Sequence, residues 1–579
     1  MNTQNNIILK GIGVSAGIAI GKVFVLKEDD FKLIEKNIHK DKIEDEYFRF
    51  QEAIKKTRLE LQDNQEDLNK MLGENYAKIA KAHILILEDP IINNEVKNII
   101  STGKNVEYAL YKTVEKISKS FDAIKDEYFR ERKNDLIDVA KKIMRHLLEK
   151  EKETLENLNS ASIVVAKNLS PSDTVSMKES MIKGFATDMG GRTSHTALVA
   201  QSLEIPAVVG LKNITEKVKQ GMSIVIDGNN GIVVLNPTKE TLENYKREYE
   251  IQIAYQKDLE KFKDLTATTL DGEEIVLEAN IENPDEVKSV LKHGANGIGL
   301  YRSEYMFLTK NTMPTEEEHF QSYSKIAKMM MPYEVIIRTI DLGGDKISKL
   351  GLMNIGREAN PFMGLRAIRL CLKYPELFKR QLRGILRASV YGNIKIMYPM
   401  ITKISEIKQA NAILEQSKEE LKKEGKSFDE NIQVGAMIEV PSAALIADLI
   451  ANEVDFMSIG TNDLIQYTMA VDRVNEKVAD LYNPMHPAII RLIKNITDAG
   501  HRAGKTVGMC GEMASDPKFT PVLIGLGLDE LSMSSIQIPK IKKVIRNLKK
   551  QKAKALVDKI LDCKSLEEIE TTIKQFKYK

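Results

Sequence analysis

The second half of the chain repeats one pattern: a short apolar run rich in β-branched residues, followed by a longer segment with helical spacing. The runs lie at residues 275–278, 297–301, 335–338, 394–398, 434–438, 456–459, 506–509 and 530–533. Eight strands that alternate with helices are typical of a (β/α)₈ barrel, whose strands are buried on both faces and therefore read as continuous apolar runs. We predict such a barrel over residues 266–579. The run at 297–301 is ambiguous, because Gly297-Ile298-Gly299 is equally compatible with a turn.

Polar residues follow these runs, and in a barrel of this kind the chemistry lies at the carboxyl ends of the strands. In chain order they are Asn280, Arg302, Arg338, Asp341, Glu439, Asn462, Asp463 and Cys510. The carboxylates Glu439 and Asp463 suit a hard divalent cation such as Mg²⁺. Four arginines are suited to holding phosphate and carboxylate groups through forked hydrogen bonds: Arg302, Arg338, Arg366 and Arg473. Taken singly, each of these arginines and acids is more often a surface salt-bridge partner. Their shared placement at strand ends on one face of the barrel predicts a site for a small, multiply anionic phosphorylated substrate.

Cys510 has two interpretations. It can be a small buried apolar residue, which is how free cysteines often behave. Its place after the seventh predicted strand also suits a thiol that donates a proton to substrate, because an ordinary thiol is protonated at neutral pH.

The first half of the chain is organised differently. Residues 1–26 are short apolar runs broken by glycines, which predicts a strand or two with tight turns. Residues 30–152 are charged, poor in glycine and apolar at helical spacing, which predicts several antiparallel helices. Between residues 162 and 237 short apolar runs predict an α/β unit whose last two strands form a hairpin around 228–231. Residues 238–265 predict a solvated helix that links this unit to the barrel.

Within the α/β unit, Gly190-Gly191-Arg192-Thr193-Ser194-His195 falls where a strand gives way to a helix. Glycines let backbone N–H groups approach an anion, and a helix N-terminus favours negative charge. His195 at this point can act as a nucleophile that accepts a phosphoryl group, since imidazole is largely unprotonated near neutral pH. The alternative interpretation is a capped loop with a solvated histidine.

Composition limits the other classes of function. The 579 residues are enough for about three domains, and the formal net charge of +2 indicates neither a nucleic-acid partner nor an anionic membrane. Three separated cysteines indicate neither a disulfide framework nor a zinc site. No apolar run approaches the roughly 18 residues that span a bilayer, and residues 1–10 lack a signal-peptide pattern. We expect a cytoplasmic protein without membrane insertion.

Taken together, these motifs resemble the enzyme I family of the bacterial sugar phosphotransferase system, the phosphoenolpyruvate–protein phosphotransferases. The likeness runs from Gly11-Ile12-Gly13-Val14-Ser15 to the end of the barrel. Its most specific parts lie at residues 190–200, 338–346, 360–364 and 456–464.

The resemblance implies a role for each motif residue. His195 would be the phosphorylated histidine, and Thr174 would hydrogen-bond its ring. Phosphoenolpyruvate (PEP) would bind to Arg302, Arg338, Arg366, Asn462, Asp463 and Arg473. Glu439 and Asp463 would hold Mg²⁺, and Cys510 would protonate the enolate.

The resemblance also implies a domain plan. Residues 1–29 and 153–237 would form the phosphohistidine α/β domain, and residues 30–152 the helical subdomain that binds the histidine-containing phosphocarrier protein. Residues 238–265 would be the helical linker, and residues 266–579 the PEP-binding barrel, which would also form a homodimer.

The chain departs from the family pattern at three places that carry no assigned chemistry. It has Ala359 in Glu358-Ala359-Asn360-Pro361, Leu365 where the family often has Trp, and Ser303 where Thr is usual. Two rival functions remain open. One is an enzyme of the pyruvate phosphate dikinase or PEP synthase kind, which needs a nucleotide-binding domain, although only 194 residues precede His195. The other is a regulator that keeps the fold and senses phosphorylated metabolites without catalysis.

Overall fold

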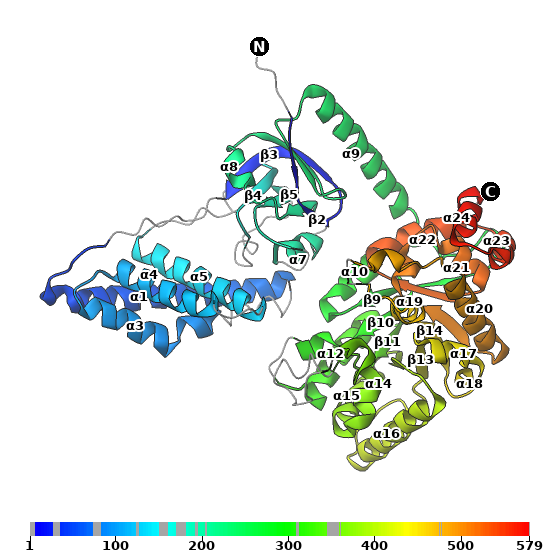
Figure 1. Ribbon diagram of the computed structural model, residues 1–579. Helices are drawn as coiled ribbons and strands as arrows, with labels where there is room; N and C mark the ends of the chain where they lie inside the picture. Colours follow the sequence, from blue (N-terminus) through cyan, green and yellow to red (C-terminus); the bar gives the residue numbers. More distant parts are fainter. Residues whose placement is uncertain are drawn as a thin grey trace. The chain divides into compact units, whose positions relative to one another are not determined.

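The computed structural model describes residues 6–26, 35–72, 83–122, 127–149, 160–169, 181–191, 195–202, 205–308, 312–343, 358, 360–473, 475 and 477–577. The chain divides into two compact units, Met1–Tyr255 and Gln256–Lys579 (Figure 1). The dividing point lies within helix α9 (Lys239–Glu260), which ends five residues earlier than the sequence pattern predicts. Among the described residues, no helix is both long and apolar enough to cross a membrane.

An eight-stranded sheet forms the centre of the first unit, in the order β1-β8-β7-β3-β4-β5-β6-β2. Its strands are β1 (Ile7–Lys10), β2 (Ile12–Ser15), β3 (Ile18–Leu26), β4 (Ser162–Ala166), β5 (Ile182–Thr187), β6 (Ala207–Val209), β7 (Ser223–Asp227) and β8 (Ile232–Leu235). Strands β3 to β6 pair in parallel, and β7 and β8 form the predicted antiparallel hairpin. Every residue of β4 is buried, because apolar side chains cover both faces of this central strand. Two short helices accompany the sheet, α7 (His195–Ser202) and α8 (Ile214–Lys217).

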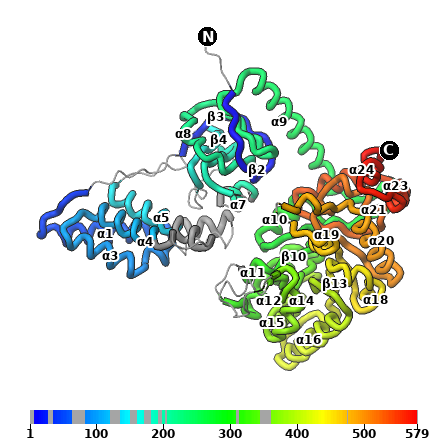
Figure 2. The backbone as a smooth tube through the Cα atoms, viewed as in Figure 1, coloured from blue at the N-terminus to red at the C-terminus, as the bar shows by residue number. Residues whose placement is uncertain are grey.

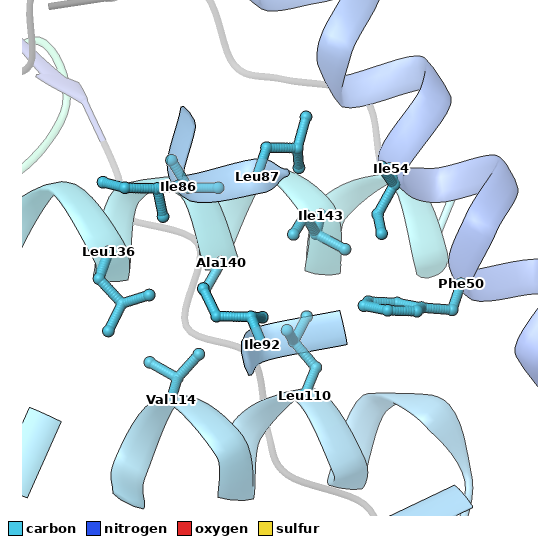
Figure 3. A pocket seen from close by; sticks show the side chains of 11 residues that line it. Phe50, Ile54, Ile86, Leu87, Ile92, Leu110, Val114, Leu136, Ala140 and Ile143 are labelled. Carbon is cyan, nitrogen blue, oxygen red and sulfur yellow. The ribbon is translucent and has the colours of Figure 1, made fainter. Parts of the chain in front are cut away.

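A group of helices is inserted between β3 and β4, as Figure 2 traces along the backbone. They are α1 (Ile43–Leu72), α3 (Pro90–Ser101), α4 (Val106–Asp122) and α5 (Glu127–Leu147). Asp89 caps α3 by accepting a hydrogen bond from the backbone N–H of Ile91 at 2.8 Å. Apolar side chains from all four helices, among them Phe50, Ile92, Leu110 and Ile143, point toward one another around a small gap (Figure 3). The gap is part of the packed core of this helical insertion.

The second unit is the predicted barrel, and its eight parallel strands close by pairing of β16 with β9. The strands are β9 (Val276–Ile281), β10 (Gly297–Arg302), β11 (Glu334–Arg338), β12 (Ile394–Tyr398), β13 (Val434–Ile438), β14 (Phe456–Ile459), β15 (Thr506–Met509) and β16 (Glu530–Met533). The ambiguous glycine-containing run is therefore a strand, β10. Strand β9 extends three residues beyond the predicted run, so Asn280 lies within the strand rather than after it.

Helices surround the strands, as Figure 1 shows. They are α10 (Val287–Lys292), α11 (Tyr305–Leu308), α12 (Glu316–Met330), α14 (Ala367–Lys373), α15 (Pro375–Ala388), α16 (Ile404–Lys423), α17 (Pro441–Leu445), α18 (Ala447–Ala451), α19 (Thr461–Met469), α20 (Pro487–Arg502), α21 (Thr520–Leu526), α22 (Ile538–Arg546), α23 (Lys550–Asp562) and α24 (Leu566–Gln575). The main apolar core lies between the strands and these helices.

A second apolar cluster fills the interior of the barrel. Its members are Leu300, Ile336, Met397, Met437, Phe456 and Cys510. Successive residues of a strand point to opposite faces, so Ile336 lies in this interior cluster while its neighbours Val335 and Ile337 face the helices. The cluster separates polar side chains at the carboxyl end of the barrel from a different polar group at the amino end.

Candidate active site at the carboxyl end of the barrel

The barrel strands bring most of the predicted site residues to one end. Arg302 and Arg338 are the last residues of β10 and β11, and Glu439 directly follows β13. Asn462 and Asp463 lie in the first turn of α19, three and four residues after the end of β14, and Cys510 directly follows β15. Because the strands are parallel and closed into a barrel, these positions share one rim.

Arg338 lies at the centre of a buried ion-pair network. Its Nη2 is 3.1 Å from Oε1 of Glu304, and its Nη1 is 3.0 Å from Oδ2 of Asp341. Glu304 also accepts a hydrogen bond from the backbone N–H of Asp341 at 2.8 Å. The side chains of all three residues are at most 12 % exposed, so the guanidinium is fixed in orientation before any substrate arrives.

Arg366 extends this network across the rim. Its Nη2 lies 2.8 Å from Oδ1 of Asp341 and 3.3 Å from Oδ2 of Asp463. Its Nη1 donates to the hydroxyl of Tyr467 at 3.3 Å, and that hydroxyl donates to the carbonyl of Phe362 at 2.5 Å. Arg366 therefore joins the loop after β11 to helix α19, which follows β14.

Glu439 is a fully buried carboxylate. Burial raises the pKa of Glu439 well above its ordinary value, the charges of Asp341 and Asp463 raise it further, and Arg338 and Arg366 oppose the rise. Its Oε1 accepts a hydrogen bond of 2.6 Å from the backbone N–H of Met400, a non-glycine residue with φ of 58°. Backbone strain of this kind is found at functional sites, where the surrounding structure maintains it.

The donor chemistry of this region fits a divalent metal. Glu439 and Asp463 offer carboxylate oxygens close enough for the charge of one to raise the pKa of the other. Hard divalent cations such as Mg²⁺ take oxygen ligands of this type, and a cation would relieve the repulsion between two buried carboxylates.

The loop after β15 is held tightly against the start of α19. Asn462 donates from Nδ2 to Oε1 of Glu512 at 3.1 Å, and its Oδ1 accepts from the backbone N–H of Glu512 at 2.9 Å. A Cβ atom on Gly511 would overlap Oγ1 of Thr461, so only glycine permits this close approach. Burial raises the pKa of the Cys510 thiol, although Ser458 and the charge of Arg338 oppose the rise. The thiol therefore remains protonated at neutral pH and lies within the electrostatic reach of Arg338.

Arg302 and Arg473 are less buried. Arg302 pairs with Glu282 at 2.8 Å, and its charge also acts on Cys510. Arg473 is exposed. Burial raises the pKa of the nearby Tyr482 hydroxyl to about 12, and the charge of Arg473 partly opposes this rise. The hydroxyl of Tyr482 donates to the carbonyl of Asn462 at 3.4 Å. Both arginines thus lie beside the buried network with part of their surface open to a ligand.

The predicted phosphohistidine region is described only in part. Helix α7 begins at His195, as the motif predicts, but the His195 side chain, Thr174 and residues 192–194 lie outside the described residues. Gly190 has φ of 117°, a conformation that favours glycine. A Cβ on Gly191 would meet no atom of the described residues within 4 Å.

Four residues of the site could not be identified from the sequence pattern. Glu304, Tyr467, Tyr482 and Glu512 each hold a predicted site residue in place through the contacts above. None directly follows a predicted strand, so the rule that polar residues after strands form the site does not find them.

Comparison with known proteins agrees with this geometry. Three family models match: "PEP-utilising enzyme, N-terminal" over residues 10–132, "PEP-utilising enzyme, mobile domain" over 158–231, and "PEP-utilising enzyme, PEP-binding domain" over 256–550. A phosphoenolpyruvate-protein phosphotransferase of Bacillus subtilis is 46% identical over 568 residues, which cover 98% of this chain and 99% of that protein. The chain belongs to the phosphoenolpyruvate-protein phosphotransferase family.

Other members of the family match along nearly their full length. The phosphotransferase of Staphylococcus aureus is 43% identical over 97% of this chain and 98% of its own. That of Priestia megaterium is 43% identical over 97% of both chains. PEP-utilising enzymes use a divalent metal, in agreement with the buried carboxylates at the barrel rim.

Proposed function

We propose that this chain transfers the phosphoryl group of PEP to its own His195 and then to a histidine of the phosphocarrier protein. This is the first step of PEP-dependent sugar uptake and phosphorylation. The observation that carries the proposal is the convergence of Arg338, Arg366, Glu439, Asp463 and Cys510 on one end of the barrel in a chain of this family.

The arginines suit both anionic groups of PEP. Arg302 and Arg473, which remain partly open, would contact the phosphate and carboxylate directly through charge-assisted hydrogen bonds. Arg338 and Arg366 are held by Asp341, so they supply positive charge at fixed positions without reorganisation during the reaction. Asn462, fixed by Glu512, would orient the bound substrate.

Mg²⁺ would be held by Glu439 and Asp463. When bound, the ion supplies a Lewis acid that spreads the negative charge of the phosphoryl group. The pairing of Asp463 with Arg366 orients its carboxylate for this task.

The chemical step breaks the bond between phosphorus and the enol oxygen of PEP and forms a bond between phosphorus and an imidazole nitrogen of His195. The electron pair of the broken bond remains on the enol oxygen, and the resulting enolate takes a proton at its methylene carbon from the thiol of Cys510 to give pyruvate. The raised pKa of the buried thiol keeps this proton available at neutral pH. Positioning and fixed charges supply most of the rate, because phosphoryl transfer asks for little covalent chemistry from the protein.

The assignment of the first unit is part of the same proposal. Thr174 would hydrogen-bond the ring of His195, and the N-terminus of α7 would stabilise the negative phosphoryl group. Residues 1–29 with 153–237 would carry the phosphohistidine, residues 30–152 would bind the carrier, and residues 238–265 would link them to the barrel. Residues 266–579 would bind PEP and pair two chains into a homodimer in the cytoplasm. Since His195 and the PEP-binding residues belong to different units, the two units must meet for the first transfer and separate for the second.

The proposal is tested by incubating the full chain with radiolabelled PEP and Mg²⁺ and mapping the label by mass spectrometry. We expect an acid-labile, base-stable phosphoryl group on His195, none on the His195→Ala variant, and no requirement for ATP. An ATP requirement would favour the dikinase alternative, and absence of labelling in the wild-type chain would favour a metabolite-sensing regulator.

A further inference from the structure

A second group of carboxylates lies inside the barrel at its amino end, away from the candidate active site. Glu334 and Glu530 are the first residues of β11 and β16, and Glu278 lies early in β9. One carboxylate oxygen from each residue lies within 4.8 Å of the other two. The interior apolar cluster around Ile336 and Met397 separates this group, called here the lower carboxylate cluster, from Glu439 and Asp463.

The neighbouring strand leaves room for the cluster. A Cβ atom on Gly297 would overlap Oε1 of Glu278, and a Cβ atom on Gly299 would overlap its Oε2. Both glycines have φ outside the left-handed region, so a turn or backbone strain does not explain them. The glycines that made β10 ambiguous in the sequence therefore create the space that the Glu278 carboxylate occupies.

Among the described residues, the cluster has fewer positive charges and hydrogen-bond donors than its three carboxylates need. Among the described residues, Lys395 is the cation paired with it, and its Nζ lies 2.7 Å from Oε2 of Glu334. Oε1 of Glu278 and Oε1 of Glu334 are buried and have no hydrogen-bond partner among the described residues, and Glu278 is only 1% exposed. With all three carboxylates ionised, the cluster would carry a net charge of about −2, which a low-dielectric interior does not tolerate without compensation.

We propose that Glu278, Glu334 and Glu530 bind a divalent, oxygen-coordinated cation at the amino end of the barrel. One such ion would balance the net charge, and it would coordinate the two buried oxygens for which the described part of the chain offers no N–H or hydroxyl donor. Separations below 4.8 Å allow one cation to bridge all three residues. An ion can enter from the barrel end, because the side chains of Glu334 and Lys395 are 20% and 15% exposed.

The role of this site is structural. The ion would tie β9, β11 and β16 together beneath the strands that carry the candidate active site, and it would take no part in phosphoryl transfer. The inference therefore goes beyond the proposed function and does not depend on it.

The test counts bound Mn²⁺, a spectroscopically visible ion of this class, on the full chain after treatment with a chelator and in the absence of PEP. The variants are Glu278→Gln and Glu530→Gln, which keep side-chain shape and remove a charge. Glu439→Gln removes a ligand of the candidate active site, and Glu376→Gln changes a glutamate whose side chain is 82% exposed. A thermal melt of each metal-free variant shows whether it is folded.

We expect the Glu278→Gln and Glu530→Gln variants to lose one bound Mn²⁺ per chain relative to the wild type and Glu376→Gln. Mn²⁺ should raise the melting temperature of Glu439→Gln, whose lower carboxylate cluster is intact, and it should raise that of Glu278→Gln by less than that of the wild type, because only the site at Glu439 and Asp463 then remains. Unchanged Mn²⁺ binding by both lower-cluster variants would overturn the proposal. It would also be overturned if wild-type Mn²⁺ binding disappeared completely in Glu439→Gln, because the lower cluster would then be neutralised by protons alone.

Discussion

Arg338 and Arg302 are both proposed to act on the same substrate, yet the structure assigns them different roles in stability. Arg338 is a buried partner of Glu304 and Asp341, whereas the Arg302 side chain is 37% exposed and its partner Glu282 is 54% exposed. Replacing each with methionine removes the charge and keeps an unbranched side chain. The pair of variants therefore separates the electrostatics of catalysis from the electrostatics of folding.

The expected size of each effect follows from burial. Removing one partner of a buried ion pair costs about 3–5 kcal/mol, because the remaining carboxylates are left without compensation. The barrel unit has about 320 residues, and at about 2.1 cal/mol/K per residue this cost lowers the melting temperature of Arg338→Met by about 4–7 °C. An exposed pair contributes about 0–1 kcal/mol, so Arg302→Met should melt within about 1.5 °C of the wild type.

Catalysis should respond differently. Arg302→Met loses a charged hydrogen bond to the substrate, and Arg338→Met loses a fixed positive charge beside it. Either loss costs about 1.5–3 kcal/mol, which is about a 10–150-fold loss in kcat/KM for pyruvate release from PEP. Thermal melts and initial rates are measured on both variants, with Arg491→Met on the exposed face of α20 as a control. Equal losses of stability in Arg302→Met and Arg338→Met, or wild-type kcat/KM in Arg338→Met, would refute this reasoning.

Three further outcomes are expected. Because burial raises the pKa of Cys510, pyruvate release by the wild type should persist above the ordinary thiol pKa of about 8.5 and fall only at higher pH. Cys510→Ala should release pyruvate slowly and show no such fall at alkaline pH. A pH–rate profile with the same alkaline fall in both proteins would contradict this expectation. Gly511→Ala should lower the melting temperature of the chain, because its Cβ would overlap Thr461, whereas Gly191→Ala should leave melting unchanged; equal melting of the two variants would be the contrary result. Burial raises the pKa of Glu60, but hydrogen bonds from His146 and Arg145 outweigh burial and lower this pKa to about 2. Ionised Glu60 therefore stabilises the fold above about pH 4.5, and this contribution is lost as the pH falls toward 2. Acid titration followed by circular dichroism should show a smaller loss for Glu60→Gln than for the wild type.

The barrel could be predicted because its strands are buried on both faces, and buried parallel strands leave continuous apolar runs in the sequence. Two features of the barrel strands could not be predicted from the sequence. The glycines of β10 are typical of a turn, and the reason for them is the Glu278 carboxylate on the neighbouring strand. Strand β9 continues through Asn280, a polar residue whose side chain donates to the carbonyl of Cys510 and accepts from Ser532 inside the barrel.

The placement of Arg338 and Glu439 at the carboxyl end of the barrel could be predicted, because each lies at the end of a recognisable apolar run. Residues that only hold a site residue in place could not be predicted. The contacts of Glu304 with Arg338 and of Tyr467 with Arg366 depend on tertiary packing, which no local sequence pattern reports. The lower carboxylate cluster was missed for a related reason. Its members lie near the amino ends of strands, whereas the rule that places barrel chemistry after the strands applies only to their carboxyl ends.

The central claim is that PEP bound at the barrel rim gives its phosphoryl group to His195. The most direct measurement is the ratio of pyruvate released to phosphohistidine formed in a single turnover, with the full chain in excess over PEP and Mg²⁺ present. The account predicts one phosphohistidine at His195 for each pyruvate, and neither product from His195→Ala. Pyruvate without phosphohistidine, or a phosphoryl group on another residue, would contradict it.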